Sequence, residues 1–324
     1  MSAQIPLNVN RFHFCPGAVS KGPSVLTGRI SYVRAKEKEL REGCLTTFAS
    51  SGGTDFLRIV QKDEAAMNHR SADTVRVPLG WGLIPAALLL AAALVIEAAG
   101  YNRGLFLALH QAGWRVSPVV WQLVTFLGGT LTALALVLPA VRRHPRLVWS
   151  VFIAGVLSFL WSHALKAGLN IPRPPLLLGP AELHVIGPVL KHGSFPSGHA
   201  TTAFTMGGVV AFRLEKWQWR LSVIALAGLV GLSRIMVGVH WPVDVLTGAG
   251  GGWLTAWAAT WLSSTWPAGV RVRKILLFLL LLCALAVPFV DSGYPAARWL
   301  AVVIALVTIP AGLLTLRAMW HGKE

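Results

Sequence analysis

Residues 79–99 read LGWGLIPAALLLAAALVIEAA, an apolar run in which Glu97 is the single charged side chain. Coiled as an α-helix, a run of this length spans about 30 Å, which is the thickness of the hydrocarbon core of a bilayer. Lipid offers the backbone no hydrogen-bond partners, so a single segment in it has to be helical. The run therefore predicts a transmembrane helix.

Seven further segments share this apolar character and lie at about 118–140, 147–167, 198–213, 219–236, 243–263, 275–290 and 297–317. The fourth and fifth of the eight are short, as expected of helices that end in a polar pocket. Only 13% of the residues are charged and 54% are hydrophobic, whereas a soluble domain carries about 25% charged residues. We predict an all-α fold, a polytopic bundle of transmembrane helices.

The N-terminal residues 1–66 differ from the rest of the chain. They show no sustained periodicity and no apolar run like that of a signal peptide. Two interpretations stay open: translation starts at Met67, or residues 1–66 form a poorly ordered cytoplasmic tail. We expect a membrane domain over 67–264 and two additional C-terminal transmembrane helices over 265–324.

Basic residues predict the orientation of the spans. Clusters occur in alternate connections, at Arg142, Arg143 and Arg146, at Arg213, Lys216 and Arg220, at Arg271, Arg273 and Lys274, and after the last span at Arg317 and Lys323. Positive loops remain in the cytoplasm, so these connections define the inner face of a cell (inner) membrane. The net charge of +16 is therefore explained by topology, and we expect no nucleic-acid partner.

Three stretches on the opposite, periplasmic side contain the polar residues that topology leaves unexplained. They are Lys166-AGLNIP-Arg173-Pro174, then Pro196-Ser197-Gly198-His199, and finally Ser233-Arg234-IMVGV-His240-WPV-Asp244. The predicted topology brings all three to the same interface, where spans three to six end. Segments far apart in the sequence are thus expected at one depth.

The cations of these stretches suggest an anion site. A lysine or arginine at the bilayer centre costs about 2.5–3.5 kcal/mol on insertion scales, so Lys166, Arg173 and Arg234 belong near the interface. They could be snorkelling anchors, but three cations opposite the topology clusters are better explained by a bound phosphate. Ser197 and Gly198 open a helix whose free N–H groups suit an anion, or else form an ordinary helix cap.

Histidines supply the candidate chemistry. His240 and Asp244 are four residues apart, which places the carboxylate within reach of the imidazole. A carboxylate on one ring nitrogen leaves the other as a nucleophile, although a structural His–Asp pair is the alternative. His199 can serve as acid and base. No carboxylate cluster suits Mg²⁺, and the three cysteines show no metal-binding spacing, so we expect neither metal nor cofactor.

Taken together, Lys-x6-Arg-Pro, Pro-Ser-Gly-His and Ser-Arg-x5-His-x3-Asp resemble the complete signature of the type 2 phosphatidic acid phosphatase (PAP2) superfamily, over about residues 80–264. The resemblance implies a six-helix core and a phosphohistidine intermediate formed on His240. It implies that Asp244 activates His240 and that His199 is the acid and base. The implied phosphate-binding residues are Lys166, Arg173, Ser197, Gly198 and Arg234.

The expected function is hydrolysis of a membrane lipid phosphate or pyrophosphate, without a metal and at the periplasmic face. Candidate substrates are phosphatidic acid, phosphatidylglycerophosphate, a polyprenyl pyrophosphate and a lipid A phosphate. A lipid-to-lipid phosphotransferase is the enzymatic alternative, and a lipid or anion transporter is the alternative from another class. A vanadate-dependent haloperoxidase is disfavoured because that chemistry needs a soluble, enclosed pocket.

Overall fold

The computed structural model describes residue 75 and residues 77–321, so the predicted tail over 1–66 and the proposed start at Met67 lie outside the described residues. All regular structure within the described part is helical, which confirms the predicted all-α class. The elements are α3 (Leu79–Ala98), α4 (Asn102–Gly113), α5 (Pro118–Leu127), α6 (Thr130–Arg143), α7 (Leu147–Leu169), α8 (Pro174–Leu177), α9 (Gly198–Ala211), α10 (Trp217–Met236), α11 (Pro242–Thr265), α12 (Val270–Ala286), the 3-10 turn η1 (Pro295–Ala297) and α13 (Arg298–Trp320).

Every predicted span corresponds to a helix, with one break. The second span is divided at Gly128–Gly129 into α5 and α6, which are bent by 65°. By length and composition alone, four helices of the described chain can cross a membrane, or five if the bent pair counts as one span. The helix α9 has 14 residues, about 21 Å at 1.5 Å per residue. The expectation of a short fifth span is wrong, because α10 extends over 20 residues.

The helix α4 was not predicted, because its apolar residues occupy only one side. Phe106 and His110 are fully buried, while Arg103 on the same helix is exposed. Such an amphipathic helix is too short and too polar to read as a membrane span. It covers one end of the bundle, where α10 and α11 contact it.

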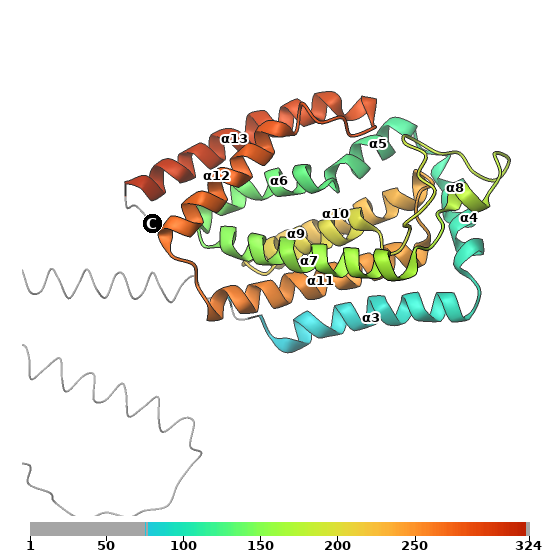
Figure 1. Ribbon diagram of the computed structural model, residues 1–324, viewed down its shortest axis with the longest axis horizontal. Coiled ribbons are helices and arrows are strands. Elements are labelled where there is room, and N and C mark those ends of the chain that lie inside the picture. Colours follow the sequence, from blue (N-terminus) through green and yellow to red (C-terminus); the bar gives the residue numbers. More distant parts are fainter. Residues whose placement is uncertain (1–74, 76, 322–324) are drawn as a thin grey trace, which may run out of the picture. The chain divides into compact units, whose positions relative to one another are not determined.

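Close packing of α9 against α11 forms the centre of the bundle (Figure 1). A Cβ atom on Gly248 would lie 2.6 Å from the carbonyl oxygen of Ser197, and one on Gly252 would lie 2.4 Å from that of Thr201. The glycines of α11 therefore allow the backbones of the two helices to approach closely. The helices α7 and α10 also pack on α9, so α7, α9, α10 and α11 form one group.

The last two helices pack on each other and both contact α6. Their connection lies beside α5, at the end of the bundle that also carries α4 and α8 (Figure 1). The same end holds the last turns of α7 and α10 and the first turns of α9 and α11. The C-terminal helices therefore reach the region where the three sequence stretches meet.

Candidate active site

A buried histidine–aspartate pair lies where α10 passes into α11. His240 is in the turn between these helices, and Gly238 allows that turn with a φ of +80°. The Nδ1 atom of His240 is 3.3 Å from Oδ2 of Asp244, and both residues are only 2% exposed. Oδ2 also accepts from the backbone N–H of Trp241 at 2.9 Å. The carboxylate is thus fixed at the first turn of α11, which Pro242 opens.

The other nitrogen of His240 faces an arginine. Nη1 of Arg173 lies 3.0 Å from Nε2 of His240 and also donates to the carbonyl of Val239 at 3.1 Å. A guanidinium can only donate, so Nε2 is the acceptor and the ring proton sits on Nδ1, facing Asp244. This is the neutral tautomer with its lone pair on Nε2, as a nucleophilic imidazole requires.

Positive charge surrounds this imidazole. The pKa of His240 is held well below the ordinary value of 6.5. Burial is the largest cause, and it is followed by the charges of Arg173, Arg234 and Lys166 and by the neighbouring His199. The neutral ring is therefore the stable form. The same charges would attract a dianionic phosphoryl group to Nε2.

The lysine and the second arginine of the predicted set are held by neutral acceptors. Nζ of Lys166, in the last turn of α7, donates to the carbonyls of Gly193 and Pro196, each at 2.8 Å. Nη1 of Arg234, in the last turn of α10, donates to the hydroxyls of Thr125 and Tyr294. No carboxylate pairs with either cation in the bonds that the structure shows, so their charge stays available to an anion.

The first turn of α9 supplies the remaining predicted residues. Ser197 occupies the N-cap position of α9, as the sequence suggested, and its hydroxyl makes no capping bond. A Cβ atom on Gly198 would meet nothing within 4 Å. The imidazole of His199 packs close to Gly128, at the bend between α5 and α6. The structure therefore brings together all eight residues singled out in the sequence.

Two buried donors at this place lack partners among the described residues. They are the hydroxyl of Ser197 and the Nε–H of Arg234. A buried donor without a partner costs about 1–3 kcal/mol, and such groups are rare unless a ligand satisfies them. Phosphoryl oxygens would accept from both.

Three hydroxyl groups of the site were missed from the sequence. Ser194 donates to Oδ2 of Asp244 at 2.5 Å, while Thr125 and Tyr294 accept from Arg234. Ser194 stands only two residues before Pro196, and its nearness to that stretch was the one available signal. Thr125 and Tyr294 lie outside all three stretches and carried no signal.

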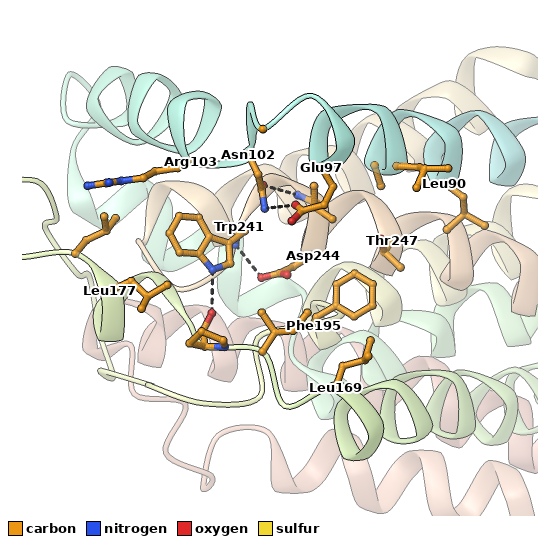
Figure 2. Close-up of a pocket in the computed structure, with 17 residues that line it drawn as sticks. Leu90, Glu97, Asn102, Arg103, Leu169, Leu177, Phe195, Trp241, Asp244 and Thr247 are labelled. Atoms are coloured by element: carbon orange, nitrogen blue, oxygen red, sulfur yellow. Dashed lines mark hydrogen bonds between the residues drawn. The ribbon is translucent and has the colours of Figure 1, made fainter.

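An apolar cavity of about 690 Å³ reaches Asp244 of the buried pair (Figure 2). Leucines of α3 and of the α7 end line it, and Asp244 and Trp241 form part of its wall. Its polar edge contains Glu97, whose carboxylate accepts from the side chain of Asn102 at 3.0 Å. A volume of this size is typical of pockets that hold a small molecule or part of a lipid.

In the described part of the chain, no group of three or more His, Cys, Asp or Glu side chains is placed to hold a metal ion.

Comparison with known proteins assigns the chain to a family. The PAP2 superfamily profile matches residues 146–268. The undecaprenyl-diphosphatase of Bacillus subtilis is 31% identical over 153 residues, which are 45% of this chain and 75% of that protein. The chain belongs to the PAP2 superfamily of membrane lipid phosphatases. The PAP2 match includes all three signature stretches, from Lys166 to Asp244.

Two further relatives are also named as phosphatases, one with the same substrate in its name and one with lipid A. An undecaprenyl-diphosphatase of Sulfolobus acidocaldarius is 31% identical over 44% of this chain and 61% of its own length. A lipid A 1-phosphatase of Rhizobium etli is 36% identical over 32% of this chain and 46% of its own length. The chain thus spans about half to three quarters of these proteins. The PAP2 match ends at residue 268, just before α12 begins, so α12 and α13 both lie beyond it.

Proposed function

We propose that this protein hydrolyses a lipid-anchored phosphate or pyrophosphate through a phosphohistidine on His240. The observation that carries the proposal is the arrangement around one imidazole: Nδ1 faces Asp244, and Nε2 is aimed at a cluster of cations. Preorganised N–H donors and cations stabilise the equatorial oxygens of a phosphoryl group in transfer.

In the first step, Nε2 of His240 attacks phosphorus in line with the leaving lipid oxygen. The P–N bond forms as the P–O bond breaks, and His199 gives a proton to the leaving oxygen. Asp244 holds the Nδ1–H of His240 and stabilises the positive ring of the intermediate. Lys166, Arg173, Arg234, the Ser197 hydroxyl and the backbone at Gly198 bind the phosphoryl oxygens.

In the second step, water replaces the lipid alcohol. Neutral His199 takes a proton from the water, which attacks phosphorus as the P–N bond breaks. Inorganic phosphate leaves and His240 returns to its neutral form. The acid of the first step is the base of the second, so the cycle closes without another titratable group.

The apolar cavity supports a substrate with a hydrocarbon tail. Leucines of α3 and α7 line it, and its wall includes Asp244, beside the proposed nucleophile. A polyprenyl pyrophosphate is our first candidate, because undecaprenyl-diphosphatases are among the relatives. A lipid A phosphate, phosphatidylglycerophosphate and phosphatidic acid are the other members of the class.

The site lies at the end of the bundle opposite the clustered basic loops, with Arg142, Arg143 and Arg146 between α6 and α7 as one example. We infer that it faces the periplasmic side of a cell inner membrane. Substrate would then enter from the outer leaflet, through the cavity beside α3.

A phosphate-release assay on the purified chain tests the proposal across the four lipid classes. We expect release from at least one of them with a chelator present, because the phosphate-binding donors are protein N–H and O–H groups. Orthovanadate, which mimics a phosphoryl group, is expected to inhibit. His240→Ala serves as the inactive control.

The possible contrary results point to different functions. No release from any lipid would contradict the proposal. Phosphate found on an added acceptor lipid, and not in solution, would indicate a phosphotransferase. Substrate-dependent flux across a vesicle without release would indicate a transporter.

The lowered pKa of His240 predicts how kcat/KM depends on pH. Because the neutral imidazole persists below its ordinary pKa of 6.5, kcat/KM should fall on the acid side only when the pH drops through that lowered pKa. The acid limb of the kcat/KM profile is therefore expected well below pH 6.5. The substrate phosphate also titrates, so its pKa is measured separately by ³¹P NMR and its contribution is removed from the kcat/KM profile. A limb at pH 6.5 or above that the substrate does not explain would contradict the prediction.

A further inference from the structure

The connection between α12 and α13 places one side chain in the candidate site. Tyr294, just before η1, is 5% exposed, and its hydroxyl accepts from Nη1 of Arg234 at 2.8 Å. Two residues later, the backbone N–H of Ala296 donates to the side chain of Gln122 on α5 at 3.1 Å. The connection is thus attached both to Arg234 and to the helix that carries Thr125.

Tight packing fixes the position of the Tyr294 ring. Gly187, with a φ of +88°, lies so close that a Cβ atom there would be 2.5 Å from Cε1 of Tyr294. Gly293, with a φ of +73°, faces Pro188 in the same way, at 2.3 Å. The N–H of Ile186 bonds to the carbonyl of Val237, three residues before His240. The ring is therefore held between its own connection and a loop tied to the site.

The hydrogen bonds divide the guanidinium of Arg234 into two edges. Nη1 has two N–H groups and donates to Thr125 and Tyr294, so both have acceptors. Nε has no partner among the described residues and shares the opposite edge with Nη2. That edge is the fork that matches two phosphate oxygens.

The chemical nature of the acceptor matters as much as its position. A carboxylate on Nη1 would also orient the guanidinium, but it would neutralise the charge meant for the substrate. A tyrosine hydroxyl and a threonine hydroxyl orient the group and leave its full positive charge. The pair of hydroxyls therefore suits an arginine that has to bind an anion.

We propose that the α12–α13 connection is a working part of the active site, in which Tyr294 is a positioning residue that aims the Nε edge of Arg234 at the phosphoryl group. The proposal rests on the proposed function, because it assigns Arg234 to phosphate binding. It goes beyond the PAP2 match, which ends at residue 268.

Tyr294→Phe tests the proposal, since it removes the hydroxyl and keeps the ring. We expect the Kd for orthovanadate, measured by calorimetry on the full chain in detergent, to rise about tenfold, and kcat/KM to fall by a similar factor. The thermal unfolding temperature should stay close to that of the unaltered protein. Tyr101→Phe is the matched control, because Tyr101 is 70% exposed in the turn before α4, and it should change neither value.

A double variant distinguishes a positioning role of Tyr294 from a general effect on stability. In Arg234→Lys, Tyr294→Phe should cause less than about a twofold further loss, because the hydroxyl acts through the guanidinium. A full tenfold loss in that background, or unchanged vanadate binding by Tyr294→Phe alone, would overturn the proposal. So would absence of vanadate binding by the unaltered chain. Failure of the proposed function appears separately, as unaltered protein that releases no phosphate.

Discussion

Replacing His240 with alanine is expected to lower phosphate release by at least about 10³-fold. The variant loses Nε2, the atom that we propose attacks phosphorus, and no other described side chain hydrogen-bonds to Asp244 as an imidazole does. The measurement is steady-state phosphate release from the best lipid of the panel. Rapid acid-free quenching with ³²P-labelled substrate should also show an acid-labile phosphoprotein in the unaltered chain and none in His240→Ala.

The control for this variant is His163→Ala. His163 is exposed on α7, and its ring lies tilted against that of Phe159 at a centroid distance of 4.1 Å. Its replacement should leave both rate and label unchanged. Near-normal turnover by His240→Ala would remove His240 as the nucleophile and with it the proposed mechanism.

Asp244→Asn is expected to lower kcat by about 10²–10³-fold while the protein still folds. Oδ2 of Asp244 accepts from three donors, namely Nδ1 of His240, the N–H of Trp241 and the hydroxyl of Ser194. An amide of the same size can accept from some of them, but it cannot neutralise the positive imidazole of the intermediate. The loss should therefore appear in kcat more than in KM.

Burst kinetics and unfolding in detergent check the Asp244 prediction. Glu215→Gln, a change at an exposed glutamate between α9 and α10, is the matched control and should behave like the unaltered protein. If Asp244→Asn were fully active, the aspartate would be only a structural cap of α11. Unfolding at a much lower temperature with a normal rate per folded molecule would lead to the same conclusion.

Most of the helices could be predicted from the sequence, because an apolar run of about 20 residues has few alternatives in a bilayer. The bend at Gly128–Gly129 could not, since residues 118–140 are continuously apolar and a glycine pair inside a span is compatible with a straight helix. The backbone turns where the side chains of Val230 and His199 pack close to Gly128, and these neighbours come from distant parts of the sequence. The amphipathic α4 was missed because hydropathy alone does not detect a helix that lies across the end of a bundle.

The residues of the candidate site likewise fall into those that the sequence could identify and those that it could not. Lys166, Arg173, His199 and His240 could be selected because charged or titratable groups are rare and costly near a membrane. Thr125 and Tyr294 could not, because hydroxyls occur throughout such helices for local reasons. Thr260, for example, merely donates to the carbonyl of Ala256 one turn earlier. Only the fold shows that Thr125 meets Arg234, which is 109 residues away.

The bond between Nη1 of Arg173 and Nε2 of His240, at 3.0 Å, affects when the imidazole is free to react. While that bond holds, the reactive lone pair is capped and cannot attack passing electrophiles. In the proposed mechanism, an incoming phosphoryl dianion competes for the same guanidinium and so frees the lone pair of Nε2. The charge of the bound substrate would thereby switch on the reactivity of His240, and the neutral imidazole would stay protected between turnovers.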